Sequence, residues 1–124
     1  MKLNEISPGI VLSPSDTLAI ILAVHECGTE IVNAKDSLLA LLNGGNDPVF
    51  EKTFKFKQPP GVNTRFDETL TGFLGGRVVS TGDDRSYTTH EELYRIAKIA
   101  LTKYNDQPRI IEYLQDIGRQ LKTR

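Results

Sequence analysis

The most regular feature of the sequence is a run of apolar positions in the first half of the chain. The steps between them alternate between four and three residues, through Ile20, Val24, Cys27, Ile31, Ala34, Leu38 and Leu41. A mean step of 3.5 residues is typical of a helix with one straight apolar seam. Ser13 and Pro14 suit a helix start, and Gly44 suits a helix end. The pattern therefore predicts one helix from about residue 13 to residue 43.

Gly28 is the weak point of this predicted helix, because a glycine inside a helix costs about 1 kcal/mol relative to alanine. In the alternative, residues 25–29 form a turn, and residues 18–24 form a buried strand paired with residues 30–33. The unbroken seam and the four alanines between positions 19 and 40 favour the single helix. A kink near Gly28 is compatible with either pattern.

The middle of the chain has a different apolar spacing. Residues 53–57 alternate between apolar and polar side chains, which predicts a half-buried strand. Residues 70–74 and 77–81 flank Gly75-Gly76, a pair that suits a two-residue hairpin turn. Phe66, Leu70 and Phe73 would also share one helical face, so residues 66–81 remain open between strands and a partly helical segment. The two glycines favour strands, and a small antiparallel sheet of two or three strands follows.

Two helices are predicted after this sheet. Thr89-His90-Glu91-Glu92 has the composition of a capping box, and apolar residues then recur every three or four positions up to Tyr104. Pro108 suits the start of the next helix, which forms a helical hairpin with the first. With residues 1–12 as an extended arm, we predict a single α+β domain over residues 1–124. Its long N-terminal helix and its C-terminal helix hairpin pack on the small sheet.

The length of the first helix also predicts an assembly. Thirty residues form a rod of about 45 Å, whereas a domain of this size has a diameter of about 28 Å. The excess apolar surface should pack against a second copy of the chain. We therefore expect a homodimer, with an interface that includes Ile20, Val24, Cys27, Ile31 and Leu38.

Composition narrows the class of protein. Fifteen basic and sixteen acidic residues give a net charge of −1, which argues against a dedicated nucleic-acid binder. A single cysteine excludes an internal disulfide and favours a reducing compartment. The longest apolar run, residues 18–24, is far shorter than the ~20 residues that span a bilayer. No signal peptide is visible, so we expect a cytoplasmic protein with no membrane partner.

The two histidines do not have the spacing of metal ligands. Metal-binding helices place ligands three or four positions apart on one face, and neither His25 nor His90 has a ligand at those positions. We therefore expect no metal and no cofactor. A small hydrolase or lyase remains a weaker alternative, with one of these histidines acting with Glu26, Asp83 or Asp84.

The segment between the predicted sheet and the following helix is the best candidate for a ligand site. Residues 81–86 form the densest polar cluster of the chain. The start of a helix attracts anions, because its free N–H groups and its dipole both point there. Candidate ligand-binding residues are Arg77, Arg85, Tyr87 and Arg109. In the alternative, the segment is a solvated connector in which the two aspartates are turn residues.

Two functions of different classes follow. The missing catalytic motif and the predicted rod favour a non-enzymatic interaction or adaptor protein that is homo-oligomeric through its long helix. The alternative is a small-molecule or anion-binding protein with its pocket near residues 82–90. The first requires a protein partner, and the second a small anionic ligand.

Overall fold

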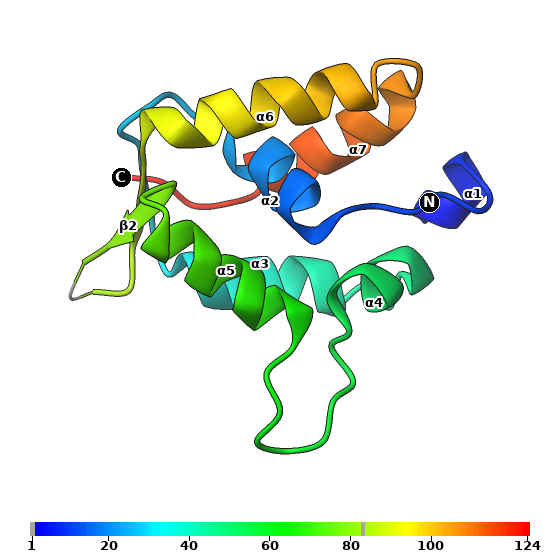
Figure 1. Cartoon of the computed structure of the whole chain (residues 1–124), viewed down its shortest axis with the longest axis horizontal. Coiled ribbons are helices and arrows are strands. Elements are labelled where there is room, and N and C mark those ends of the chain that lie inside the picture. The colour runs from blue at the N-terminus through cyan, green and yellow to red at the C-terminus, as the bar shows by residue number, and fades with distance from the viewer. Residues whose placement is uncertain (1, 83) are drawn as a thin grey trace.

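The computed structural model describes residues 2–82 and 84–124, which form an α+β fold (Figure 1). The helices are α1 (Leu3–Ile6), α2 (Pro14–Leu22), α3 (Ala34–Asn43), α4 (Pro48–Phe54), α5 (Arg65–Gly75), α6 (Glu91–Lys103) and α7 (Pro108–Arg119). The strands β1 (Glu30–Ile31), β2 (Val79–Thr81) and β3 (Tyr87–Thr89) form an antiparallel sheet in the order β1-β3-β2. The predicted class is confirmed, and so is a sheet of three strands.

Helix α2 lies at the centre of the molecule. It contacts α6 and α7 on one side and α5 on another, and Figure 1 shows it between the C-terminal helix pair and the layer of α3 and α5. All residues from Thr17 to Leu22 are buried. Because nearly every side of this short helix is covered, its sequence is apolar at consecutive positions and not only along one stripe.

The prediction of one long N-terminal helix is wrong. The predicted start is confirmed, since Ser13 Oγ accepts a hydrogen bond from the Asp16 N–H and Pro14 occupies the first helical position. The helix ends at Leu22, however, and turns occupy residues 23–29. Gly28 has φ +87°, a left-handed conformation that glycine adopts without steric cost. The alternative with a turn at residues 25–29 was right about the turn, although residues 18–22 are helix and not strand.

Thr89 holds this turn in place. Its backbone carbonyl accepts a hydrogen bond from the Gly28 N–H at 3.0 Å, and its Oγ1 donates to the Glu26 carbonyl at 3.2 Å. The predicted capping box at Thr89 is therefore wrong. Thr89 is the last residue of β3, and His90 precedes α6 without a side-chain cap.

The predicted interface seam is divided between three elements of one chain. Ile20 lies in α2, Ile31 in β1 and Leu38 in α3, and all three are buried in the core. Cys27 is exposed and Val24 is partly buried. Ile20, Ile31 and Leu38 are buried within a single chain, and the long helix that was expected to form the interface is absent. The predicted homodimer therefore has no structural basis in this fold. It stays an untested prediction.

The predicted strand at residues 53–57 is also wrong. Asp47 caps α4 by accepting a hydrogen bond from the Val49 N–H at 3.0 Å, and the helix runs to Phe54. Lys55 then adopts a left-handed conformation with φ +52°. This reversal returns Phe56 to the same aromatic cluster as Phe54, with ring centroids 5.5 Å apart. Two rings in alternate positions therefore share a side without forming a strand.

Residues 66–81 follow the helical alternative in their first part. Thr64 and Asp67 form a reciprocal capping box at the start of α5, and Phe66, Leu70 and Phe73 are its buried face. The predicted hairpin turn at Gly75-Gly76 is wrong, because these residues end α5. The hairpin that does form joins β2 to β3. The two predicted C-terminal helices are present as α6 and α7, with Pro108 as the first residue of α7, but their main contacts are with α2 and not with the sheet.

The two ends of the chain are fixed to the body. Residues 3–6 form the helical turn α1 where we expected an extended arm, because the Leu3 N–H donates to Asp47 at 2.9 Å and the Leu3 side chain is fully buried. At the other end, Arg124 N–H donates to the Glu30 carbonyl at 3.0 Å beside β1. Among the described helices, none has the length and apolar character that crossing a membrane requires.

A polar network joins this C-terminus to the β2–β3 hairpin. Ser86 Oγ lies 2.6 Å from Asp84 and 2.8 Å from Glu30, and the guanidinium of Arg124 contacts both carboxylates. The hydrogen bonds from Ser86, and then the one from Arg124, lower the pKa of Asp84 to about 2. The charged form of Asp84 is therefore favoured in the folded state.

Helices α2 and α7 approach each other most closely at Gly118. A Cβ at this position would lie 2.0 Å from the Ile21 carbonyl oxygen and 2.7 Å from Val24. We expect Gly118→Ala to destabilise the protein by about 1–3 kcal/mol or more in urea denaturation, because α7 must move away from α2. The matched control is Gly72→Ala on the exposed face of α5, where a Cβ meets nothing within 4 Å. That change should stabilise by up to about 1 kcal/mol, and equal effects would contradict this packing.

The Asp84 network predicts an acid-sensitive part of the stability. The pKa of Asp84 is about 2 when folded and 3.8 when unperturbed, so its stabilising contribution is complete above about pH 4 and is lost as the pH falls towards 2. Melting temperatures measured across this range should fall less steeply for Asp84→Asn than for wild type. Ser86→Ala, which removes the strongest hydrogen bond to Asp84, should flatten the profile too. Unchanged profiles for both variants would refute the assignment.

Candidate anion-binding site

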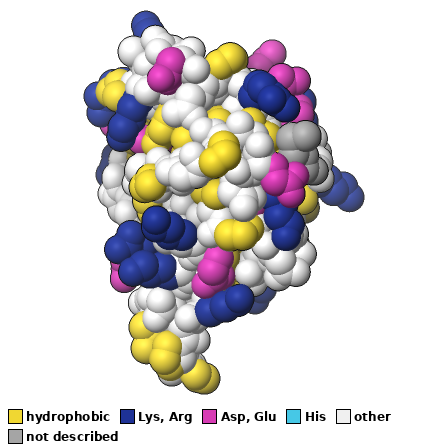
Figure 2. All heavy atoms as spheres, turned by 90° about the vertical axis from the view of Figure 1, so that its right-hand side faces the viewer, with side chains coloured by type: hydrophobic (Ala, Val, Ile, Leu, Met, Phe, Trp, Pro, Cys, Tyr) yellow, Lys and Arg dark blue, Asp and Glu magenta, His cyan; other side chains and the backbone are white. Residues whose placement is uncertain are grey.

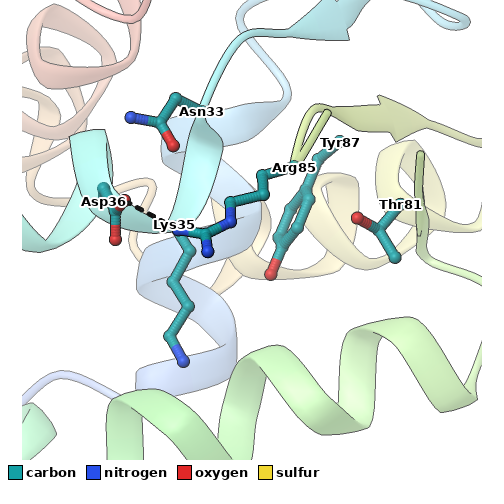
Figure 3. Close-up of a pocket in the computed structure, with 6 residues that line it drawn as sticks. All are labelled: Asn33, Lys35, Asp36, Thr81, Arg85 and Tyr87. Carbon is teal, nitrogen blue, oxygen red and sulfur yellow. Dashed lines mark ion pairs between the residues drawn. The ribbon is translucent and has the colours of Figure 1, made fainter. Parts of the chain in front are cut away.

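A pocket of about 390 Å³ lies between the first turn of α3 and the β2–β3 hairpin (Figure 3). Its lining is mostly polar and comes from two parts of the sequence, residues 33–36 and residues 81–87. The lining residues are Asn33, Lys35, Asp36, Thr81, Arg85 and Tyr87. Two cations and two hydroxyl groups therefore surround one pocket together with a single carboxylate.

The central strand of the sheet positions Tyr87. This residue pairs with Ile31 of β1 on one side and with Thr81 of β2 on the other, so its backbone is fixed by both neighbours. The side chain is largely buried, and Figure 3 shows its ring between Arg85 and Thr81. Burial, and to a lesser extent the negative charge of Asp36, raise the pKa of Tyr87 above its ordinary value. Its hydroxyl therefore stays neutral at physiological pH and can donate a hydrogen bond.

Two lining residues have an unusual backbone. Asn33 has φ +49° and Arg85 has φ +63°, both in the left-handed region. Residues other than glycine adopt this region at a cost of about 1 kcal/mol or more, and such residues cluster at functional sites. The two left-handed residues turn the chain into α3 and around the hairpin tip, and so bring the two halves of the pocket together.

Arg85 is only weakly neutralised. It lies 3.9 Å from Asp36, with side chains that are 82% and 58% exposed, and an exposed pair of this kind contributes about 0–1 kcal/mol. Lys35 instead points to the half-buried Asp67 of α5, at 3.3 Å. Helix α3 also starts without a side-chain cap, because Asn33 makes no capping hydrogen bond. Its first N–H groups and its dipole therefore add positive potential on the same side.

The structure brings only part of the predicted site together. Arg85 and Tyr87 share the pocket. Arg77 lines a separate open depression of about 710 Å³ with Ser80 and His90, and Arg109 lies at the start of α7 beside a shallow surface pocket.

The half of the pocket at residues 33–36 was missed, because these residues were assigned to the middle of the long helix. Asn33 could have indicated a break between β1 and α3, because asparagine tolerates the left-handed conformation found there.

Within the part of the chain that the structure describes, neither histidine forms a hydrogen bond or ion pair with a carboxylate proposed for it. His25 Nε2 lies 2.8 Å from the Gly118 carbonyl oxygen, and His90 Nε2 lies 2.8 Å from Ser80 Oγ. Asp84 is held by Ser86 and Arg124, and Asp83 lies outside the described residues. Within residues 2–82 and 84–124, no three His, Cys, Asp or Glu side chains are placed to hold a metal ion.

Comparison with known proteins finds no matching family model, no matching curated protein and no matching solved structure. What the pocket can bind therefore follows from its own side chains. It combines the weakly paired Arg85, a helix start without a cap and two neutral hydroxyl groups, and this set suits a small anion.

Proposed function

We propose that this protein binds a small anionic ligand in the pocket between α3 and the β2–β3 hairpin. The observation that carries the proposal is the position of Arg85 beside the uncapped start of α3, with the hydroxyl groups of Tyr87 and Thr81 lining the same pocket. The partner of Arg85, Asp36, is exposed, so a ligand can replace it. The anion-binding alternative therefore has more support than the adaptor hypothesis, whose long helix is absent.

A phosphate or carboxylate group fits the chemistry of the pocket. The guanidinium of Arg85 can bind two anionic oxygens with parallel hydrogen bonds. The hydroxyl groups of Tyr87 and Thr81 can donate to further oxygens of the ligand. Asp36 opposes a negative charge, so the bound group must displace Arg85 from Asp36, and the weakness of that pair keeps the cost low.

The cationic side chain of Arg85 should determine affinity without affecting folding. We expect Arg85→Gln to weaken binding of inorganic phosphate, measured by isothermal titration calorimetry, by about 10- to 150-fold. This range corresponds to the about 1.5–3 kcal/mol of a hydrogen bond to a charged group. The melting temperature should stay unchanged, because the side chain is mostly exposed.

Arg77→Gln is the matched control. Arg77 is also an exposed, left-handed arginine next to β2, but it lies outside the pocket. This variant should bind phosphate as wild type does. Equal losses in both variants would indicate a general charge effect, and no phosphate binding by wild type would refute the proposal.

A further inference from the structure

The two residues that flank Arg85 in the hairpin bond to groups outside the pocket. Ser86 Oγ lies 2.6 Å from Asp84 and 2.8 Å from Glu30 of β1, and the Ser86 N–H donates to Asp84 at 3.2 Å. Arg85 lines the pocket, whereas Asp84 and Ser86 do not. The left-handed Arg85, with φ +63°, is therefore directed to the pocket while its neighbours are engaged beside β1.

Arg124 neutralises the carboxylates beside β1. Its guanidinium lies 2.7 Å from Glu30 and also contacts Asp84. Residues 122–124 run along the edge of β1, joined to it by backbone hydrogen bonds of 2.8 Å and 3.0 Å. Figure 1 shows the chain ending next to the sheet. The backbone therefore fixes the place from which the Arg124 side chain reaches Asp84.

Without Arg124, a negative charge would lie next to the cation of the pocket. Asp84 precedes Arg85 in the chain, and consecutive Cα atoms are about 3.8 Å apart. A carboxylate this close attracts the guanidinium and repels an incoming anion. Asp84 is instead held by Arg124 and Ser86. Within residues 2–82 and 84–124, the ion pair of Arg85 is the weak one with Asp36, so its guanidinium stays available to a ligand.

The wider surface does not supply a positive field that would make this neutralisation unnecessary. The chain has a net charge of −1, and Figure 2 shows acidic and basic side chains interspersed on the side of α1 and α4. Charges act over about one Debye length, ~10 Å at 0.1 M salt. An anion at the pocket therefore depends on the charges near Arg85, and Asp84 is one of them.

We infer that Arg124 is a positioning residue of the anion site. By pairing with Asp84, it leaves the guanidinium of Arg85 free to bind a phosphate or carboxylate group. This inference rests on the proposed function and adds to it a residue that does not line the pocket. Arg124 acts through Arg85, and so it sets the affinity for the anion without contacting it.

The test is a double-mutant cycle in which binding of inorganic phosphate is measured by isothermal titration calorimetry at neutral pH. Arg124→Gln should weaken binding by roughly 3- to 30-fold, the range for residues that modulate a site without touching its ligand. Arg124→Gln/Asp84→Asn should recover most of this loss, because the carboxylate that competes for Arg85 is gone as well. A purely structural role of the pair would leave the double variant as weak as Arg124→Gln.

The matched control is Arg119→Gln. Arg119 is another exposed arginine, which pairs with Asp116 at the end of α7, and its variant should bind phosphate as wild type does. Arg124→Lys keeps the positive charge and should lose less affinity than Arg124→Gln. If Arg124→Gln does not fold, as judged by its melting curve, Arg124→Lys and Arg124→Lys/Asp84→Asn provide the same comparison.

The two proposals fail in different ways. If wild type does not bind phosphate, or if Arg85→Gln binds it equally well, the anion site falls and the role of Arg124 falls with it. If Arg85→Gln weakens binding but Arg124→Gln does not, the pocket stands and the role of Arg124 is overturned. The same conclusion follows if Asp84→Asn fails to restore the affinity of Arg124→Gln, or if Arg119→Gln causes an equal loss.

Discussion

The burial of α2 on nearly every side is the constraint on which the rest of the structure depends. A helix of nine residues can be covered in this way only if its neighbours approach closely, and Gly118 allows α7 to contact the backbone of α2 at Ile21. The chain turns after Leu22, and hydrogen bonds with Thr89 and Tyr94 fix the direction in which it returns.

That turn also determines where the candidate site forms. Thr89 ties residues 26–29 to the end of β3, so β1 must lie beside β3 and α3 must start next to the hairpin. The left-handed Asn33 then directs the first turn of α3 towards Arg85. The left-handed backbone at Asn33 thus brings residues 33–36 next to residues 81–87, about fifty positions later in the sequence.

The sequence was most informative where local signals agreed with packing. The start of α2 was predicted because its capping residue Ser13 and the apolar spacing indicate the same element. Helices α6 and α7 were predicted from their apolar spacing, although the expected cap of α6 at Thr89 was wrong. The prediction of one helix through Cys27 was wrong, because regular spacing of apolar residues does not show that they all lie in one element. The predicted strand at residues 53–57 was wrong, because the left-handed conformation of Lys55 places the rings of Phe54 and Phe56 on one side, as a strand would. For the site, Arg85 and Tyr87 were predicted from the polar segment that precedes α6. Lys35 was not predicted, because its place depends on the turn before β1, which the spacing of apolar residues does not reveal.

Total charge is a poor guide to the partners of this chain, because electrostatic attraction acts over about one Debye length, ~10 Å at 0.1 M salt. Several acids near α5 are already engaged, whereas Glu91 and Glu92 of α6 line the open depression beside Leu74 at the C-terminal end of α5. Asp67 caps the helix and pairs with Lys35, and Glu51 accepts a hydrogen bond from the Lys57 N–H. A nearly neutral protein can therefore bind an anion strongly, provided that its fold separates the charges by more than this distance.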